Sequence, residues 1–206
     1  MTPVQISRIS RSMVRAIPLL ALLAMMGCAA PMMSTKEELQ SVSAKEGVVI
    51  GSILFTVAKG PKDESAWAFL RGRKAEDVEW KVTFGEVGSQ PFATTYAISA
   101  KPGKEEVFIK KLPPGEYNIQ RAEPAGLFGL SSNQYVSLSI YFKVEPQQTS
   151  YIGKLEVNVP DRIMMGSRVR VAISDSQEET VAKLQSEYPS AVGNTVKSLA
   201  SQSTIR

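Results

Sequence analysis

Apolar and polar residues alternate along much of the chain between positions 47 and 174. A period of two residues is that of a half-buried β-strand. Four segments follow it clearly: 78–84, 136–144, 151–159 and 168–173. The side chains expected to share an inward face in these segments are Val78, Trp80, Val82 and Phe84; Val136, Leu138, Ile140, Phe142 and Val144; Tyr151, Leu155, Val157 and Val159; and Val169, Val171 and Ile173.

A further segment, VVIGSILFTV at 48–57, is apolar on both faces and predicts a central or sheet-crossing strand. Weaker strand candidates lie at 66–71, 94–99, 105–111 and 116–121. Eight or nine short strands separated by turn residues favour an antiparallel β-sandwich. A parallel α/β fold is disfavoured because no helical pattern separates consecutive strands.

The sharpest turn signal is Pro114–Gly115 within KKLPPGEYNI. Proline fixes φ at about −65° and glycine tolerates positive φ, which suits the central pair of a type II turn. Tyr117 and Ile119 then alternate inward. The stretch FIKKLPPGEYNI resembles the matching hairpin of prealbumin-like and carboxypeptidase-regulatory-like domains, closely here and loosely over 47–174. The resemblance implies an Ig-like or prealbumin-like sandwich that serves as an interaction or stabilising module, with no catalytic residue.

One C-terminal α-helix is predicted after the last strand. Ser176 and Glu179 have the spacing of a capping box, and Val181, Leu184 and Tyr188 recur at helical intervals. Pro189 is expected to end this helix. The remaining residues, 190–206, are polar with a faint apolar stripe and predict a marginal helix or a frayed tail.

The chain opens with a basic stretch followed by the apolar run IPLLALLAMM at 17–26. A bilayer-spanning helix needs about 20 apolar residues, so this shorter run is typical of the central region of a signal peptide. Met13 is an alternative start that leaves a shorter leader with the same organisation. A signal peptide is therefore predicted over 1–27.

The apolar run ends at Gly27-Cys28-Ala29-Ala30, which resembles a bacterial lipobox. The resemblance implies that the Cys28 thiol receives a diacylglycerol, that the leader is cut before Cys28, and that the new amine is acylated. Because Ala29 and not aspartate follows, resemblance to Gram-negative lipoproteins implies the outer membrane. The alternative is an ordinary signal peptide cut near the same place, which leaves Cys28 as a free thiol. Residues 28–46 are then the lipidated cysteine and a flexible tether of roughly 20–25 Å.

The amino-acid composition disfavours several kinds of partner, cofactor and catalytic activity. The formal charge of +4 arises from 24 basic and 20 acidic residues, and three of the basic residues lie in the leader, so no nucleic-acid partner is expected. Histidine is absent and Cys28 is the only cysteine, which leaves no disulfide, no thiolate cluster and no expected metal or cofactor. The motifs of serine hydrolases and phosphate-binding loops are missing, so an enzyme is not expected and no catalytic residue set emerges.

Three surface features are candidates for partner binding. Leu127, Phe128 and Leu130 lie between glycines and serines outside any strand pattern, as in a partner-binding loop; alternatively they plug one end of the sandwich. Arg71, Arg73 and Lys74 suit an anionic ligand, although a solvated turn is favoured. Arg168 and Arg170 share one strand face, where solvated charge is again the favoured interpretation.

The leading hypothesis is a lipid-anchored β-sandwich at the outer membrane, facing the periplasm, that binds a protein assembly or a glycan. The alternative is a structural subunit of a larger envelope complex, which docks through residues 175–206. The expected organisation is 1–27 signal peptide, 28–46 lipidated cysteine and tether, 47–174 sandwich, and 175–206 helix and tail.

Overall fold

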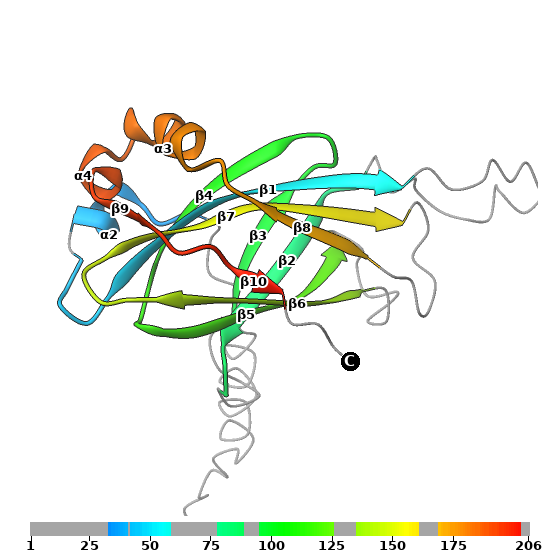
Figure 1. The fold of residues 1–206 in the computed structure, drawn as a ribbon, viewed down its shortest axis with the longest axis horizontal. Coiled ribbons are helices and arrows are strands. Elements are labelled where there is room, and N and C mark those ends of the chain that lie inside the picture. Colours follow the sequence, from blue (N-terminus) through cyan, green and yellow to red (C-terminus); the bar gives the residue numbers. More distant parts are fainter. Residues whose placement is uncertain are drawn as a thin grey trace, which may run out of the picture.

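The computed structural model describes residues 33–40, 42–58, 78–88, 95–125, 135–160 and 169–202. This part of the chain is mainly β and forms two five-stranded sheets with short helices on the outside of one of them (Figure 1). The predicted sites Cys28, Leu127, Phe128 and Leu130 lie outside the described residues.

The first sheet has the order β4-β1-β7-β8, and β9 also pairs with β7. Its strands are β1 Gly47–Ala58, β4 Glu105–Leu112, β7 Thr149–Pro160, β8 Arg170–Ser174 and β9 Thr195–Lys197. The second sheet has the order β10-β6-β5-β2-β3. Its strands are β2 Trp80–Glu86, β3 Tyr96–Ala100, β5 Gly115–Pro124, β6 Val136–Val144 and β10 Ser201–Gln202.

The prediction of a wholly antiparallel sandwich is wrong for two pairings in the first sheet. β1 and β7 run parallel, as do β7 and β9, whereas the second sheet is antiparallel throughout. A parallel pair needs a long crossover connection in place of a tight hairpin. The chain supplies it because it passes through the second sheet twice between β1 and β7.

The main apolar core lies between the two sheets. The inward sets predicted for 78–84 and 136–144 are confirmed, since every one of those side chains is buried. β1 lies between β4 and β7, as expected for a central strand. Its Val49, Ile53 and Phe55 join the core between the sheets, while Val48 and Ile50 belong to a second cluster beneath the helices.

The face assigned to Tyr151 from the alternation is wrong. Gly153 has φ of +110°, and the β1–β7 register shifts between Ile50 and Ser52. A bulge of this kind reverses the faces on either side of it. Ile152 and Leu155 therefore both point into the core between the sheets, and Tyr151 points to the helices.

The predicted hairpin around Pro114 is a corner between sheets. β4 pairs with β1 in the first sheet, whereas β5 pairs with β2 and β6 in the second. Gly115 does not have positive φ, so the type II turn is not formed. Tyr117 and Ile119 point inward as predicted, and the Tyr117 hydroxyl donates to the carbonyl oxygen of Pro113 at 2.9 Å. This hydrogen bond fixes the connection between the two sheets to the start of β5.

The predicted C-terminal helix is α3, Gln177–Gln185, but its capping box is not formed. The backbone N–H of Gln177 donates to Asp175 Oδ1 at 3.2 Å, and the Ser176 side chain makes no capping bond. The helix ends before Pro189, which instead occupies the start of a short second helix, α4 Pro189–Val192. Proline suits that position because its missing N–H would have no partner there.

The expectation of a frayed tail or marginal helix after 190 is also wrong. Beyond α4, the chain forms β9 against β7 and then β10 against β6, so it joins both sheets. Between these strands the N–H groups of Ser198 and Ala200 donate to the carbonyls of Tyr151 and Ile152, each at 2.9 Å. We call residues 195–202 the strap. It belongs to the sandwich, whose boundary therefore extends beyond 174.

The flexible tether expected over 29–46 is wrong for its described part. Residues 36–40 form helix α2, Lys36–Gln40, and Leu39 is buried beside α4 and the outer face of the first sheet. The sandwich domain therefore gains an N-terminal segment that the apolar pattern from position 47 does not include.

Candidate functional site

Most of the charged clusters proposed from the sequence cannot be placed. Arg71, Arg73, Lys74 and Arg168 lie outside the described residues, like Cys28 and the 127–130 loop. Arg170 is exposed on β8, on the face opposite to the packed side chains Val171 and Ile173. The described part of the chain brings other polar groups together in four places.

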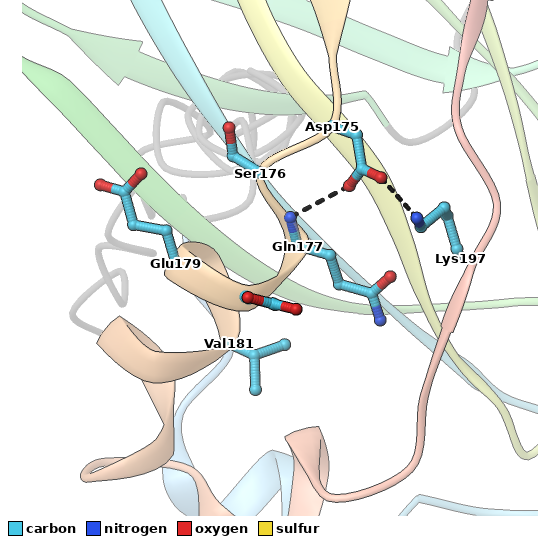
Figure 2. A pocket seen from close by; sticks show the side chains of 7 residues that line it. Asp175, Ser176, Gln177, Glu179, Val181 and Lys197 are labelled. Carbon is cyan, nitrogen blue, oxygen red and sulfur yellow. Dashed lines mark hydrogen bonds and ion pairs between the residues drawn. The ribbon is translucent and has the colours of Figure 1, made fainter.

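An open depression of about 620 Å³ lies where β8 leads into α3, next to the strap (Figure 2). Asp175 forms an ion pair with Lys197 across it, and Gln177 Nε2 donates to the carbonyl of Thr195 at 3.1 Å. The hydrogen bond from Lys197 lowers the pKa of the Asp175 carboxyl, and the same contact raises the pKa of Lys197. These polar groups pair with one another, so their contacts hold the strap against the start of α3.

A second cluster joins α3 to the first sheet. Glu105 on β4 forms ion pairs with Lys154 on β7 at 3.0 Å and with Lys183 on α3 at 3.3 Å. Lys183 also pairs with Glu179 at 2.8 Å. Ser52 is the register partner of Lys154 and is fully buried.

Ser52 and Lys154 are neighbours on adjacent strands, and a serine–lysine pair is the catalytic site of some hydrolases. Such a site needs an accessible serine and a neutral lysine as its base. The hydrogen bond from Glu105 raises the pKa of Lys154, so this amine stays protonated, and Ser52 is 0% exposed. The cluster is therefore suited to holding α3 on the sheet and not to acyl transfer.

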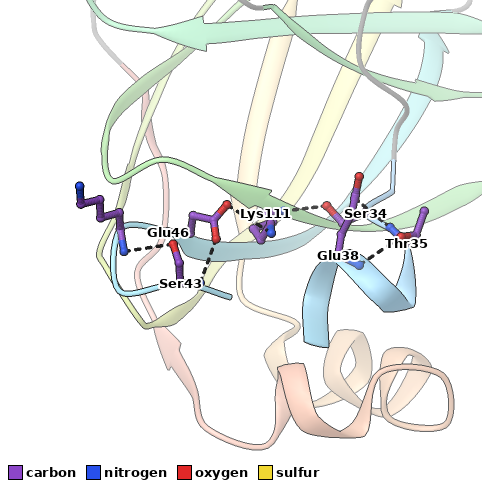
Figure 3. A network of polar contacts seen from close by, with 7 residues as sticks. Ser34, Thr35, Glu38, Ser43, Glu46 and Lys111 are labelled. Carbon is purple, nitrogen blue, oxygen red and sulfur yellow. Dashed lines mark hydrogen bonds and ion pairs between the residues drawn. The ribbon is translucent and has the colours of Figure 1, made fainter. Parts of the chain in front are cut away.

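The N-terminal segment is fastened to the edge strand β4 (Figure 3). The backbone N–H of Ser34 donates to the carbonyl of Ile109 at 2.9 Å, and Lys111 N–H donates to Ser34 Oγ at 2.9 Å. We call residues 34–40 and 42–46 the clasp. It occupies part of a sheet edge that would otherwise present unpaired backbone groups.

A capping box starts the helix within the clasp. Thr35 N–H donates to Glu38 Oε2 at 3.0 Å, and Glu38 N–H donates to Thr35 Oγ1 at 3.2 Å. The sequence carries this signal as Thr35-x-x-Glu38 directly before Leu39. Apolar alternation does not reveal this helix, because five residues make too few turns to show a period.

Glu46 holds the C-terminal end of the clasp. Ser43 N–H donates to Glu46 Oε2 at 2.9 Å, and Lys111 Nζ lies 3.2 Å from Glu46 Oε1. The backbone hydrogen bond from Ser43 is the main cause of the lowered pKa of Glu46, to which Lys111 adds. The clasp is thus held at both ends, by Ser34 and by Glu46.

The outer face of the second sheet carries a further polar network. Glu123 pairs with Lys81 at 2.7 Å and with Arg121 Nε at 3.4 Å, and Arg121 Nε also donates to Thr83 Oγ1 at 3.3 Å. The guanidinium of Arg121 lies 5.9 Å from the ring centre of Tyr135, which is 46% exposed. A polar face with an exposed tyrosine suits contact with a partner that hydrogen-bonds and stacks.

Among the described residues, no group of His, Cys, Asp or Glu side chains could hold a metal ion, and no helix is long and apolar enough to cross a membrane. No family model and no curated protein matches the chain. Among solved structures, a leucine-rich repeat protein from Bacteroides thetaiotaomicron matches 58% of this chain and 15% of its own length, at 12% identity and a TM-score of 0.32. The chain therefore spans a small part of that protein, and a likeness at this TM-score carries no argument.

Proposed function

We propose that the protein is a lipid-anchored module of the bacterial envelope, held at the outer membrane through Cys28 and facing the periplasm. It acts by binding a partner, either a protein assembly or a glycan, and has no catalytic step. Its body is an Ig-like or prealbumin-like sandwich. The hydrogen bond from the Tyr117 hydroxyl to the Pro113 carbonyl supports this assignment, because it resembles the tyrosine corner of immunoglobulin-type sandwiches.

The observation that carries the proposal is the position of the clasp. It begins at Ser34, six residues after Cys28, and it is bound to β4 through both backbone and side chain. A lipid on Cys28 would thus be joined to the folded body by a short link. Acyl chains on one residue hold a domain at a membrane firmly when two or more are present.

The outer face of the second sheet is the partner surface of the proposal. Its charged groups are already paired with one another through Glu123, so binding there need not bury an unpaired charge. Tyr135 lies beside the network and is about half exposed, and Tyr141 adds a partly buried ring farther along β6. Sugars and extended peptides offer the stacking and hydrogen-bonding groups that such a face accepts.

The test of anchoring is the Cys28→Ala variant of the full chain. In cells fed a radiolabelled fatty acid, the wild-type chain is expected to carry the label and to stay with the membranes after an alkaline wash. Cys28→Ala is expected to lose the label and to appear in the soluble fraction. An exposed serine at the surface, Ser137→Ala, serves as the matched control. Cys28→Ala that remains as firmly membrane-bound as wild type overturns the proposal.

A structural subunit is the second candidate function, and one observation favours it. Val196 and Leu199 on the strap are 47% and 44% exposed, which places two large apolar side chains on the surface close together in sequence. Because the strap completes both sheets, truncating residues 175–206 would damage the fold as well as any docking site. The double substitution Val196→Ser and Leu199→Ser tests docking instead: a smaller native complex with an unchanged unfolding midpoint supports this second function.

A further inference from the structure

We propose that the lipidated protein holds the α2 side of its domain against the bilayer and directs the outer face of the second sheet away from it. The inference rests on the proposed lipidation of Cys28 and adds an orientation to it. The surface facing the membrane is formed by the clasp and the edge strand β4.

The link between Cys28 and the folded body is short. Ser34 is fixed to Ile109 and Lys111, and Met33 packs against the apolar cluster beneath the helices. Six Cα–Cα steps separate Cys28 from Ser34, and a fully extended chain covers at most about 3.3–3.6 Å per residue. The lipidated residue therefore lies within about 20 Å of Ser34, however the link is arranged.

The link is short in comparison with the folded body. A compact domain of this length has a radius of gyration of about 15 Å and a width of about 35–40 Å. The link is shorter than that width, so the domain cannot turn over and bring its far side to the bilayer. A free tether over the whole of 29–46 would have allowed every orientation.

The α2 side of the domain is the side nearest to the lipid. The clasp is bound at the β4 edge, and Met33 and Leu39 pack on the helix-covered face of the first sheet. The second sheet lies on the opposite face of the first sheet (Figure 1). Its outer face, with Arg121 and Tyr135, is therefore the layer farthest from the lipid.

The charges on the near side do not attract a bilayer by themselves. Lys111 is paired with Glu46, Lys104 is paired with Glu106, and Lys36 is followed by two glutamates. An anionic membrane attracts clusters of four or more uncompensated basic residues. The side is held near the membrane by the link, and the chain without lipid is expected not to bind vesicles of anionic lipid.

A fluorescence experiment tests the orientation. The lipid occupies the thiol of Cys28, the only cysteine, so a cysteine introduced elsewhere is the one free thiol of the full chain. The matched variants are Lys36→Cys on α2 and Lys143→Cys on the outer face of β6, both at exposed lysines. Each is labelled with the same fluorophore and reconstituted into vesicles whose headgroups carry a spin-label quencher.

The inference predicts at least threefold stronger quenching at position 36 than at position 143. Inserting twelve Gly/Ser residues between Ala30 and Pro31 is expected to remove most of that difference. Equal quenching without the insertion, or stronger quenching at 143, overturns the orientation while leaving the anchor in place. A wild-type chain that, when purified from cells, carries no lipid on Cys28 and does not float with the vesicles overturns the proposed function, and the orientation with it.

Discussion

The backbone N–H of Ser176 donates to the phenolic oxygen of Tyr151 at 2.7 Å. This bond ties the start of α3 to the strand that the bulge at Gly153 has turned over, so that a tyrosine predicted for the main core instead positions a helix. The N–H of Ser176 is one of the unpaired donors at a helix start, and the tyrosine supplies its acceptor.

Removing this acceptor is expected to destabilise the domain. Tyr151→Phe keeps the buried ring but leaves the Ser176 N–H without its partner, at a cost of about 1–3 kcal/mol. Urea unfolding followed by tryptophan fluorescence measures the change. Tyr141→Phe, on the outer face of the second sheet, is the matched control and should stay within about 0.5 kcal/mol of wild type. The role assigned to Tyr151 fails if both variants unfold at the same urea concentration.

The bulge itself gives a second prediction. Gly153 has φ of +110°, and a Cβ atom there would lie 2.8 Å from Ile173 Cγ2. Gly153→Ala is therefore expected to cost at least about 1–3 kcal/mol, through strain at positive φ and the displaced side chain.

Gly193→Ala is the control for this substitution. Gly193 has φ of −60°, and its added Cβ would meet its nearest neighbour at 3.5 Å, an ordinary contact. Replacing this glycine should leave stability unchanged or raise it by up to about 1 kcal/mol, by restricting the unfolded chain. Thermal unfolding of both variants decides the matter, and a neutral Gly153→Ala would contradict the bulge.

The ion cluster at Glu105 predicts a loss of stability in acid. Burial would raise the pKa of Glu105, but its contacts with Lys154 and Lys183 outweigh burial and hold that pKa below the ordinary 4.5. A depressed pKa contributes stability that is fully present above the unfolded-state value and is lost as the pH falls through the folded-state value. Unfolding free energy measured between about pH 6 and pH 3 should therefore decline below about pH 4.5.

Substitution isolates the share of Glu105 in that decline. Glu105→Gln should lower the unfolding free energy at pH 7 by about 1–3 kcal/mol and flatten the acid limb, because two lysines lose their partner. Its neighbour Glu106 pairs with Lys104, whose side chain is 68% exposed, so Glu106→Gln should cost less than about 1 kcal/mol. An acid limb equally steep in wild type and Glu105→Gln would contradict the assignment.

Shortening the C-terminus tests the strap. A chain that ends at Gly193 loses β9 and β10, which exposes the edges of β7 and β6 that they pair with, and it also removes Ala200 from the core. Such a chain should unfold at lower temperature and aggregate, since unpaired strand edges recruit other chains. A chain that ends at Gln202 keeps the strap and should behave as wild type in the same melting and gel-filtration experiments. Equal behaviour of the two chains would show that the strap adds nothing to the sandwich.

Local alternation predicted most of the strands because each buries one face. The patterns at 78–84 and 136–144 carry their own signal, and their inward sets are those of the structure. Which strands pair with one another depends on long-range packing. Local sequence patterns therefore could not predict the parallel β1–β7 pair or the sheet-to-sheet corner at Pro113.

The clasp and the strap escaped prediction for a related reason. β10 is two residues long and α2 is five, and elements so short depend on tertiary contacts more than on sequence period. The cluster at Glu105 likewise joins β4, β7 and α3, three elements that are far apart in sequence. Only the Thr35-x-x-Glu38 capping signal was visible in advance.

The parallel pair of β1 and β7 also sets the order in which the chain can fold. Val48 pairs with Thr149, about a hundred residues later, and the first sheet has β1 at its centre. Contacts of such long range must overcome a large loop-closure entropy before they stabilise anything, so folding is expected to be slow. Because the C-terminal strap is part of both sheets, the domain is expected to complete its fold only after residue 202 has been synthesised.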